Sequence, residues 1–516
     1  MLHRPLTALR AVPRLTGRRA AAAAVGLGAL SVLALPPISL VPVLLLTIPG
    51  LLAMIGASAG VRQAGWIGFG FGFGFYLVGL YWITNAVLVM AAEYWWLVPL
   101  AVPAVALVLA PFIALPCALA RLVAPGWRRI AVLAGAWVMA DLARQFVLTG
   151  FPWNPLGSVW EMPGWLGTAF IQPAAWISVH GLTLLTVLLA AMPALGRRGW
   201  AAGAVGLALW FGLGAARLRQ PDPAPGDLRV VLVQGDIAEG HVLDQAFALQ
   251  SFRRYLALTR DGVDRAGPGR SVVIWPESAS PFLLTIDNGA RRAIMDAAQP
   301  AVAALVGSVR FPQGVWTGKP DNRPRNSLIA LTDHGAIAAI YDKWHLVPGG
   351  EYAPAWFPFG IQLVPGGGFA PGPGPRTLHV PGLPPVGPLI CYEAVFPGQG
   401  VDERDRPAWL VNVTNDAWFG NSLGPRQHLA AARMRAVEEG LPLVRAANTG
   451  ISAAFDSRGR PLGRLGLGRT GTLIVALPGA LPPTPFARWG LVLPFLLALG
   501  CLSLGLSVTR KRPVGT

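Results

Sequence analysis

The sequence predicts a polytopic α-helical membrane bundle of eight transmembrane helices joined to an α/β domain. Of its 516 residues, 53% are hydrophobic and only 13% are charged, and the mean hydropathy is +0.50. These proportions are too apolar for a soluble enzyme, so much of the chain is expected to lie in lipid. Apolar runs of spanning length recur in the first part, whereas 228–478 carries short Val- and Ile-rich runs that are typical of strands.

The charged residues are distributed as in a membrane protein. The formal net charge is +17, but the arginines stand in short clusters between apolar runs and form no single basic face. We therefore set nucleic-acid binding aside. The three cysteines, Cys117, Cys391 and Cys501, provide no disulfide framework, because two of them lie inside apolar runs that are expected to span the membrane.

Seven apolar stretches in the first part of the chain are candidates for spans, since a helix needs about 20 residues to cross a bilayer. They lie at 20–35, 39–58, 65–90, 95–119, 130–148, 168–195 and 199–216. An eighth, at 489–508, closes the chain and is followed by Arg510, Lys511 and Arg512. These runs predict a seven-helix membrane domain at 1–217, an α/β domain at 228–478 and a C-terminal transmembrane helix at 487–509.

The positive charge of short loops predicts the orientation, because cytoplasmic loops are enriched in Lys and Arg. Arginines precede the first span and mark every second loop after it: Arg4, Arg10, Arg14, Arg18, Arg19, Arg62, Arg121, Arg128, Arg129, Arg197 and Arg198. Both termini are therefore expected in the cytoplasm, with the α/β domain on the opposite side. The first span is expected to be an uncleaved helix rather than a signal peptide, since the alternation needs all eight spans.

Two features of the membrane part are interpreted through packing. The repeat GFGFGFGF at 68–75 places glycines at four-residue spacing and predicts close contact between helices. Asp141 and Arg144, in or near the fifth span, are expected to pair, since a lone charge in lipid is costly. A contact between Arg144 and a lipid headgroup is the weaker alternative.

The α/β domain follows the linker RQPDPAPGD at 219–227. Strands are predicted within 228–237, 271–278, 301–310, 326–333, 336–344, 384–393, 407–416, 441–450 and 471–478. Helical patterns at 246–266 and 424–440 fall between some of them, which indicates a layered domain with a buried sheet. The Pro- and Gly-rich segment 364–388 is predicted to be a loop and is our candidate for a movable cover. Just before it, Trp356, Phe357 and Phe359 either fill a core or form a membrane-facing lip.

Three chemically complementary side chains follow three of the predicted strands: Glu277, Lys343 and Cys391. Ligands gather at the carboxyl ends of strands in layered α/β domains, so these residues are expected to converge. A carboxylate accepts the thiol proton, the thiolate attacks a carbonyl carbon, and an ammonium stabilises the resulting anion. The alternatives are a buried structural cysteine, a solvated acid and a surface lysine. Because a free thiol outside the cell is exposed to oxidation, its retention favours the reactive interpretation.

Several motifs, in their order along the chain, resemble those of the apolipoprotein N-acyltransferases, which are membrane members of the nitrilase superfamily. They are WPE at 275–277, YDKWHLVPGGEYAP at 341–354, GPLICYE at 387–393, VNVTNDAWFG at 411–420, AANTGIS at 446–452 and TGFPWNPLGSVW at 149–160. The resemblance covers the whole chain. It implies a nitrilase-like αββα catalytic domain on the extracytoplasmic side of a bacterial cytoplasmic membrane.

The resemblance also implies a role for each site residue. Glu277 corresponds to the general base, Lys343 to the group that stabilises the oxyanion, and Cys391 to the nucleophile. Two further acids match ones that the family requires near the thiol, and the backbone N–H of the residue after the nucleophile is placed to help bind the oxyanion; these residues are Glu351, Glu393 and Tyr392. One departure is Leu243, where the family commonly has tryptophan, and it affects how that edge of the pocket holds lipid.

The reaction implied by the resemblance is a ping-pong acyl transfer. Cys391 takes an acyl chain from a membrane phospholipid, phosphatidylethanolamine in our interpretation, and becomes a thioester. The free α-amine of the diacylglyceryl-cysteine at the N-terminus of an apolipoprotein then attacks the thioester, and an amide forms. No cofactor and no metal are implied, and the enzyme is expected to be a monomer.

Other interpretations stay open beside this one. GNSLG at 420–424 matches a serine-hydrolase pattern, but Ser422 does not directly follow its strand and Pro425 follows the motif. His345 and His428 suggest a Cys-His protease or a metal site, yet no matching ligand spacing occurs. The two remaining classes are a membrane-anchored amidohydrolase, whose thioester passes to water, and a noncatalytic membrane partner with a relict nitrilase domain.

Overall fold

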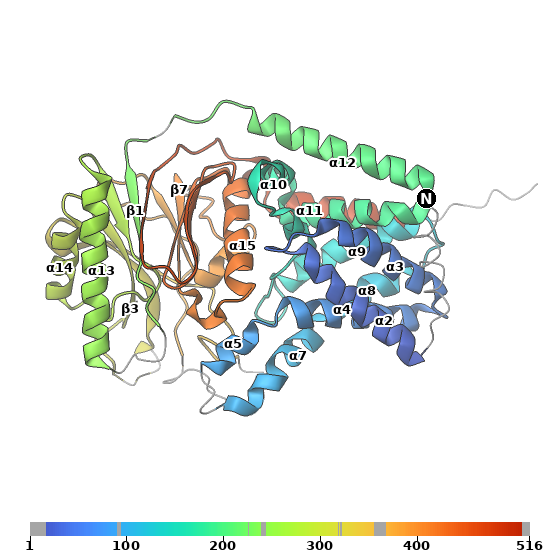
Figure 1. Ribbon diagram of the computed structural model, residues 1–516, viewed down its shortest axis with the longest axis horizontal. Coiled ribbons are helices and arrows are strands. Elements are labelled where there is room, and N and C mark those ends of the chain that lie inside the picture. Colours follow the sequence, from blue (N-terminus) through green and yellow to red (C-terminus); the bar gives the residue numbers. More distant parts are fainter. Residues whose placement is uncertain are drawn as a thin grey trace, which may run out of the picture. The chain divides into compact units, whose positions relative to one another are not determined.

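A computed structural model describes residues 17–89, 94–224, 226–238, 244–317, 319, 322–354 and 368–507 (Figure 1). The described residues form two compact units. The helical unit lies within Met1–Val87, Ala92–Arg217 and Leu491–Thr516, and the α/β unit lies within Leu88–Ala91 and Leu218–Gly490.

Some features predicted above fall outside the described residues. They are Leu243, the aromatic residues Trp356, Phe357 and Phe359, positions 364–367 of the predicted loop, and the terminal basic residues Arg4, Arg10, Arg14, Arg510, Lys511 and Arg512.

The helical unit has at least one helix in each of the predicted apolar stretches. Its helices are α2 (Gly17–Ser31), η2 (Val32–Ala34), η3 (Val41–Val43), α3 (Leu44–Ala57), α4 (Val61–Gly79), α5 (Ile83–Leu88), η4 (Trp95–Leu97), α7 (Val98–Leu109), α8 (Pro111–Ala120), α9 (Trp127–Arg144), η5 (Leu156–Trp160), α10 (Gly164–Ile171), α11 (Ala174–Ala191), η6 (Met192–Leu195), α12 (Arg197–Leu218) and α17 (Val492–Leu506).

Three of the described helical segments are long and apolar enough to cross a membrane. They are Trp95–Ala120, Ala174–Leu195 and Arg197–Leu218, whereas Val41–Ala57 and Val492–Leu506 are apolar but shorter. Length and composition thus identify three spans among the described residues, and the predicted total of eight goes beyond this count.

Two predictions about packing inside the helical unit are confirmed. A Cβ on Gly74 of α4 would lie 2.0 Å from the carbonyl oxygen of Val25 in α2, so only glycine permits this approach. Asp141 and Arg144 of α9 form a buried ion pair of 3.0 Å between Oδ1 and Nη2. Arg144 also donates to the carbonyl oxygen of Phe151 at 2.9 Å, so protein groups satisfy this buried cation.

The α/β unit contains a six-stranded sheet in the order β11-β1-β2-β3-β4-β5 and a five-stranded sheet in the order β10-β9-β8-β7-β6. The strands are β1 (Arg229–Gln234), β2 (Ser271–Ile274), β3 (Ala303–Arg310), β4 (Arg325–Thr332), β5 (Ala336–Asp342), β6 (Val386–Ile390), β7 (Trp409–Thr414), β8 (Leu443–Ala447), β9 (Ser452–Phe455), β10 (Pro461–Leu465) and β11 (Gly471–Ala476). The helices are α13 (Gln245–Ala266), α14 (Asn288–Ala298), η8 (Asp333–Gly335), η11 (Cys391–Val395), η12 (Asp416–Phe419), α15 (Gly424–Glu439) and α16 (Pro485–Trp489). Neighbours within β1-β2-β3 and within β6-β7-β8 are parallel, and the other pairs are antiparallel.

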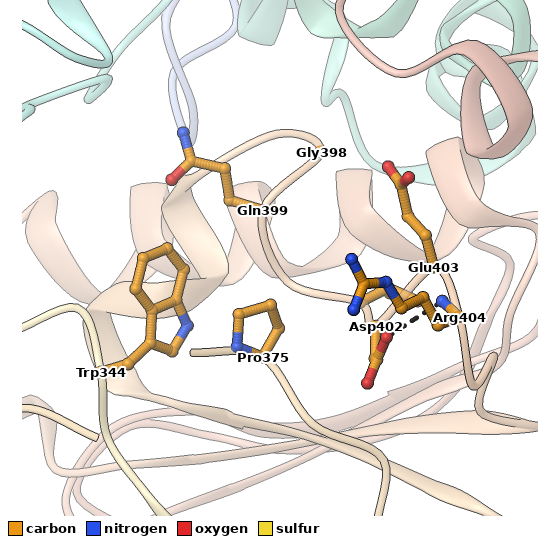
Figure 2. A pocket seen from close by; sticks show the side chains of 8 residues that line it. Trp344, Pro375, Gly398, Gln399, Asp402, Glu403 and Arg404 are labelled. Atoms are coloured by element: carbon orange, nitrogen blue, oxygen red, sulfur yellow. Dashed lines mark hydrogen bonds between the residues drawn. The ribbon is translucent and has the colours of Figure 1, made fainter. Parts of the chain in front are cut away.

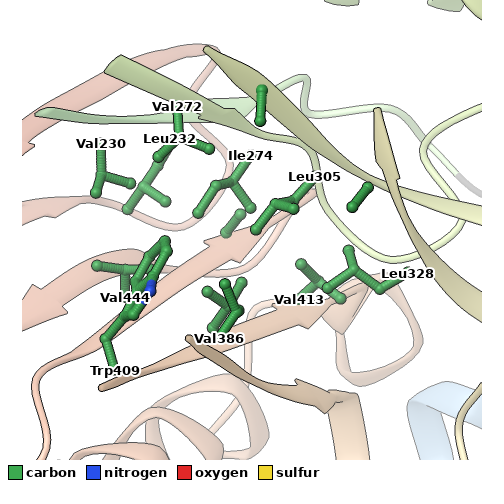
Figure 3. Packing of buried hydrophobic residues seen from close by; sticks show 14 of the residues in the cluster. Val230, Leu232, Val272, Ile274, Leu305, Leu328, Val386, Trp409, Val413 and Val444 are labelled. Atoms are coloured by element: carbon green, nitrogen blue, oxygen red, sulfur yellow. The ribbon is translucent and has the colours of Figure 1, made fainter. Parts of the chain in front are cut away.

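The two sheets pack face to face and are covered by helices on their outer faces. Val230 and Leu232 of β1 point toward the other sheet and share a buried cluster with Trp409 of β7 (Figure 3). Val231 and Val233 point the opposite way and pack in the cluster that includes α13 and α14, while α15 covers the five-stranded sheet. The unit therefore has four layers, helix-sheet-sheet-helix, as predicted. Burial on both faces explains why its strands are continuous apolar runs.

The strands β9 and β10 and the helix α14 were not predicted from the sequence, and one loop was predicted to extend too far. The strands β9 and β10 are short and consist mostly of small or exposed residues, so they lack the apolar run that marks the other strands. The predicted loop 364–388 ends earlier, because β6 begins at Val386 and includes Pro388. Proline is tolerated there because β6 is the edge strand of its sheet, where one side of the backbone has no ladder to join.

Candidate active site

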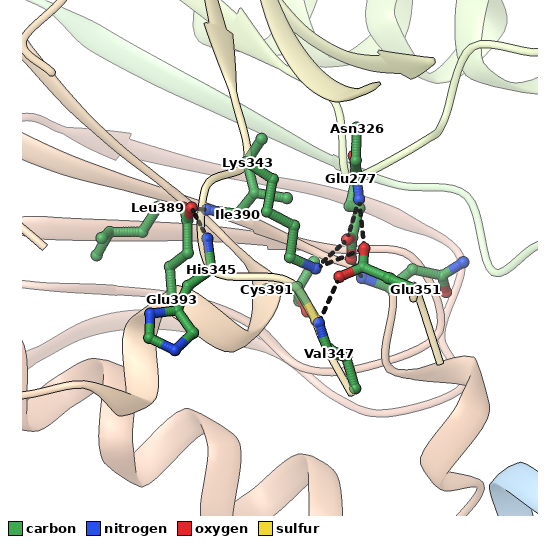
Figure 4. Close-up of polar contacts among 12 residues, drawn as sticks. Glu277, Asn326, Lys343, His345, Val347, Glu351, Leu389, Ile390, Cys391 and Glu393 are labelled. Carbon is green, nitrogen blue, oxygen red and sulfur yellow. Dashed lines mark hydrogen bonds and ion pairs between the residues drawn. The ribbon is translucent and has the colours of Figure 1, made fainter. Parts of the chain in front are cut away.

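Glu277, Lys343 and Cys391 lie together where strands of both sheets end. Glu277 follows β2, Lys343 follows β5, and Cys391 follows β6 and begins η11 (Figure 4). The first two strands belong to the six-stranded sheet and the third to the five-stranded sheet. Face-to-face packing of the sheets therefore brings together three residues that are far apart in the sequence.

Glu277 is buried, and both oxygens of its carboxylate are held by donors. Asn326 of β4 donates from Nδ2 to Glu277 Oε1 at 2.6 Å, and the backbone N–H of Asn415 donates to Oε2 at 2.8 Å. Gly307 of β3 lets the backbone of Pro276 and Glu277 lie close to the sheet, because a Cβ at position 307 would be 2.0 Å from the carbonyl oxygen of Pro276. The orientation of the carboxylate is thus determined by protein groups rather than by solvent.

Lys343 lies between two carboxylates and is only 1% exposed. Its Nζ donates to Glu277 Oε1 at 3.1 Å and to Glu351 Oε1 at 2.8 Å. Glu351 is fixed in turn by the backbone N–H of Val347, which donates to Oε2 at 2.8 Å. Burial by itself lowers the pKa of Lys343, but the two carboxylates outweigh it and raise that pKa well above its ordinary value. The lysine therefore remains a cation.

Cys391 is 7% exposed and has a φ of +50°, in the left-handed region that non-glycine residues seldom adopt. Such strain persists only where surrounding contacts maintain it, and it is concentrated at active sites. Burial raises the pKa of the Cys391 thiol, the carboxylate of Glu277 adds to the increase, and the ammonium of Lys343 opposes it. The resting thiol is consequently protonated and needs a base to become a nucleophile.

Glu393 ties the end of β5 to the end of β6. Its Oε1 accepts the backbone N–H of Trp344 at 2.8 Å, and its Oε2 accepts the N–H of Ile390 at 2.7 Å and the hydroxyl of Tyr341 at 3.0 Å. Burial raises the pKa of Glu393 to about 7, although these donors oppose the increase. Because Trp344 adjoins Lys343 and Ile390 adjoins the nucleophile, Glu393 sets the spacing between the cation and the thiol.

The side chain of Tyr392 packs in an aromatic cluster next to the nucleophile. Its ring lies 5.9 Å from His345 and 5.0 Å from Phe396, between ring centroids. The histidine therefore contributes to packing at this position. The backbone N–H of Tyr392 belongs to the peptide that follows Cys391, where η11 begins.

Ser422 and His428, the residues behind two competing interpretations, do not form a second catalytic site. Ser422 Oγ donates to the carbonyl oxygen of Phe419 at 2.7 Å and accepts the N–H of Gly424 at 3.1 Å, so it organises the start of α15. His428 is fully buried, and its Nε2 lies 2.9 Å from the carbonyl oxygen of Cys391. This contact is with the backbone of the nucleophile and not with its sulfur.

Several residues that hold the site together were not predicted from the sequence. Asn326 donates to Glu277 and, at 3.1 Å, to Glu351, and Asn415 donates its backbone N–H to Glu277. Asn415 follows β7 directly, so the same strand-end argument could have singled it out. Asn326 lies near the start of β4 and carries no comparable signal, because its importance comes from contacts with Glu277 and Glu351, which lie outside its own strand.

The described part of the predicted cover loop is bound to the site by its backbone. The N–H of Phe369 donates to the carbonyl oxygen of Glu351, and that of Gly372 donates to the carbonyl oxygen of Lys343, both at 2.8 Å. These bonds hold 369–372 beside Lys343 and Glu351, so this segment frames the site.

A shallow pocket of about 340 Å³ lies beside Trp344 (Figure 2). Its lining residues are Trp344, Pro375, Gly398, Gln399, Val401, Asp402, Glu403 and Arg404. Trp344 adjoins Lys343 in sequence, but none of the predicted site residues lines this pocket.

Both parts of the chain are similar to known proteins. Residues 27–192 match the model of the apolipoprotein N-acyltransferase N-terminal domain, and residues 230–482 match the carbon-nitrogen hydrolase model. The chain is 39% identical to an apolipoprotein N-acyltransferase of Rhodopseudomonas palustris over 521 residues, with 95% of each chain covered. It is 40% identical to one of Bradyrhizobium diazoefficiens over 503 residues, with 92% of each covered. Among solved structures, a Nesterenkonia amidase of the nitrilase superfamily is 19% identical, with a TM-score of 0.37 over 51% of this chain and 95% of that one.

Proposed function

Because the chain belongs to the apolipoprotein N-acyltransferase family, we propose that Glu277, Lys343 and Cys391 carry out its reaction in the cluster described above. The enzyme is an acyltransferase that moves an acyl chain from a phospholipid, through a cysteine thioester, to the α-amine of the N-terminal S-diacylglyceryl-cysteine of a lipoprotein. The observation that supports this assignment best is the buried contact of Lys343 with both Glu277 and Glu351 beside a strained, buried Cys391.

In the first half-reaction the thiol of Cys391 loses its proton to Glu277 as Sγ attacks the ester carbonyl of the phospholipid. The carbonyl oxygen of the ester becomes an oxyanion, and Lys343 Nζ and the backbone N–H of Tyr392 stabilise its charge. When the intermediate collapses, the leaving alkoxide takes the proton from Glu277 and departs as a lysophospholipid. An S-acyl thioester remains on Cys391.

In the second half-reaction the α-amine of the lipoprotein attacks the thioester carbonyl. Glu277 now accepts a proton from the amine, and the same two donors stabilise the second oxyanion. The carbon-sulfur bond then breaks, the thiolate is reprotonated through Glu277, and an amide is released. Because the nucleophile is buried, water has little access to the thioester. This limits hydrolysis, and the family relationship supports transfer rather than an amidohydrolase or a noncatalytic partner.

The membrane arrangement is a further part of this proposal. We assign eight spans: seven in a membrane domain at 1–217 and one in a C-terminal helix at 487–509. The catalytic domain at 228–478 then lies outside the cytoplasm, and both termini lie inside it. The alternation of arginine-rich loops supports this orientation. Both substrates are lipids, and withdrawing an acyl chain into water costs about 0.8 kcal/mol per CH₂ group, so a catalytic domain anchored at both ends suits them.

Phosphatidylethanolamine as the donor and a monomeric enzyme complete the proposal. Lys343 and Cys391 act on the ester group, which all diacyl phospholipids share, so the preference for a headgroup is a matter for measurement. Initial rates with vesicles that differ only in their phospholipid headgroup test the first point. Light scattering of the detergent-solubilised protein tests the second.

Trapping of the acyl-enzyme tests the mechanism directly. The detergent-solubilised protein is incubated with phospholipid in the absence of lipoprotein, and Cys391 is examined by mass spectrometry for the mass of one acyl chain. Adding a synthetic diacylglyceryl lipopeptide should remove the adduct and yield N-acylated peptide. An unmodified thiol under conditions of turnover would refute the mechanism, and release of free fatty acid alone would support a hydrolase.

A further inference from the structure

His428 of α15 has no role in the mechanism above, yet it contacts the backbone of the nucleophile. The ring is fully buried, and Nε2 lies 2.9 Å from the carbonyl oxygen of Cys391. A carbonyl oxygen only accepts hydrogen bonds, so Nε2 is the donor. The contact therefore acts on the peptide that joins Cys391 to Tyr392.

A buried charge pair holds the other side of the ring. Nδ1 of His428 lies 2.9 Å from Asp416 Oδ1 and 3.1 Å from Arg445 Nη2, while the same Nη2 donates to Asp416 Oδ2 at 2.7 Å. Asp416 and Arg445 are at most 1% exposed. Burial, reinforced by the Arg445 cation, lowers the pKa of His428 even though Asp416 opposes the decrease. These contacts on Nδ1 fix the orientation of the ring, and Nε2 is its donor to the Cys391 carbonyl.

The geometry of the peptide group gives this contact a consequence for catalysis. The peptide is planar and trans, so the carbonyl of Cys391 and the N–H of Tyr392 point in opposite directions. A donor that fixes the carbonyl also fixes the direction of the N–H. The φ of +50° at Cys391 is unfavourable for a residue with a side chain, so this peptide needs an external contact to hold it.

We propose that His428 is a positioning residue of the acyl transfer: by holding the Cys391 carbonyl, it aims the N–H of Tyr392 at the oxyanion. Asp416 and Arg445 keep the ring in place. Asp416 begins η12, two residues after β7, and Arg445 lies in β8; β7 lies between β8 and β6 in the same sheet. The arrangement couples the rigid sheet to the oxyanion donor through one side chain. This inference rests on the proposed function, because it assigns a part of the same reaction.

Two reactions of Cys391 separate this role from a structural one. Acylation by phospholipid builds an oxyanion, whereas alkylation by iodoacetamide displaces iodide from a saturated carbon and builds none. In His428→Phe, which keeps a planar ring but cannot donate, acylation should slow at least about 10-fold and up to the roughly 10²- to 10³-fold range of a lost oxyanion donor. Alkylation should stay within about threefold of wild type, because the thiol and Glu277 are unchanged.

His428→Gln and Leu429→Met serve as comparisons. The glutamine amide can donate toward the same carbonyl oxygen, so acylation should recover to within about 10-fold of wild type if the donor is what matters. Leu429, the next residue of α15, packs against the apolar cluster between α15 and the five-stranded sheet. Methionine has a similar volume, so Leu429→Met should leave both reactions unaltered.

The results distinguish this inference from the proposed function. Slow acylation with normal alkylation in His428→Phe, together with rescue by His428→Gln, supports the positioning role. Equal losses in both reactions, or no loss of acylation, would overturn it. A wild-type protein that is alkylated but never acylated would instead contradict the proposed function.

Discussion

Replacing Lys343 with methionine tests how the site keeps two carboxylates ionised next to a thiol. In the wild type, Nζ is 3.1 Å from Glu277 Oε1 and 2.8 Å from Glu351 Oε1, so these oxygens are no more than about 6 Å apart. Without the cation, two like charges at about 6 Å repel by about 3 kcal/mol at an effective dielectric constant of 20. Uptake of one proton by the pair relieves this repulsion, and a protonated Glu277 is no longer a base.

Lys343→Met should therefore lose acylation in two ways that respond differently to pH. Loss of the oxyanion cation slows the reaction by roughly 10²- to 10³-fold at every pH. Uptake of a proton by the carboxylate pair removes the base, so the remaining rate should rise with pH over a range that lies above that of wild type. The measurement is the rate of acyl-enzyme formation by quenched mass spectrometry between pH 5 and 9.

Lys343→Arg is the matched control, because it keeps the positive charge between the carboxylates but places a larger, planar group in a buried site. Its rate should be reduced, while the pH range of its activity should match that of wild type. If Lys343→Met has the wild-type pH profile, or if both variants acylate at the wild-type rate, the assignment of Lys343 as the cation that serves both the base and the oxyanion is wrong.

Three further predictions concern the surroundings of the site and the packing of the helical unit. Asn326→Ala removes the hydrogen bonds to the carboxylates of Glu277 and Glu351, each worth about 1.5–3 kcal/mol, so acylation should slow by about 10- to 100-fold. A single-turnover acylation rate near that of wild type would contradict a role for these two hydrogen bonds. Burial raises the pKa of Glu393 to about 7, so the folded state holds this proton more tightly than the unfolded state, and wild type should lose about 3 kcal/mol of stability as pH rises from 4.5 to 7. In denaturant unfolding, the stability of Glu393→Gln should not show this decrease with pH. If wild type and Glu393→Gln lose stability in parallel as pH rises, Glu393 is not the group responsible. Gly74→Val should lower the melting temperature of the detergent-solubilised protein by overpacking α2 against α4, whereas Gly26→Ala, where a Cβ meets no atom within 4 Å, should not; equal melting temperatures for both would contradict the close packing.

Local patterns predicted the elements of the α/β unit where burial makes them visible in the sequence. The strand β1 is apolar at successive positions because Val230 and Val231 are buried against different layers. The strand β10 was missed because its residues are mainly exposed and carry no such pattern. The helical stretches were found by hydropathy alone, but the breaks within them depend on local features, such as Pro111 at the start of α8.

The sequence by itself determined the chemical types of the central residues, Glu277, Lys343 and Cys391, and the resemblance of their motifs to one family. Only the tertiary structure decided how those residues are held. Asn326, Glu393 and His428 act across strands or helices that are distant in the chain, through contacts of 2.6 to 3.1 Å. Hydrogen bonds of this kind depend on where the two sheets place each backbone. A linear sequence read without relatives carries no record of that placement.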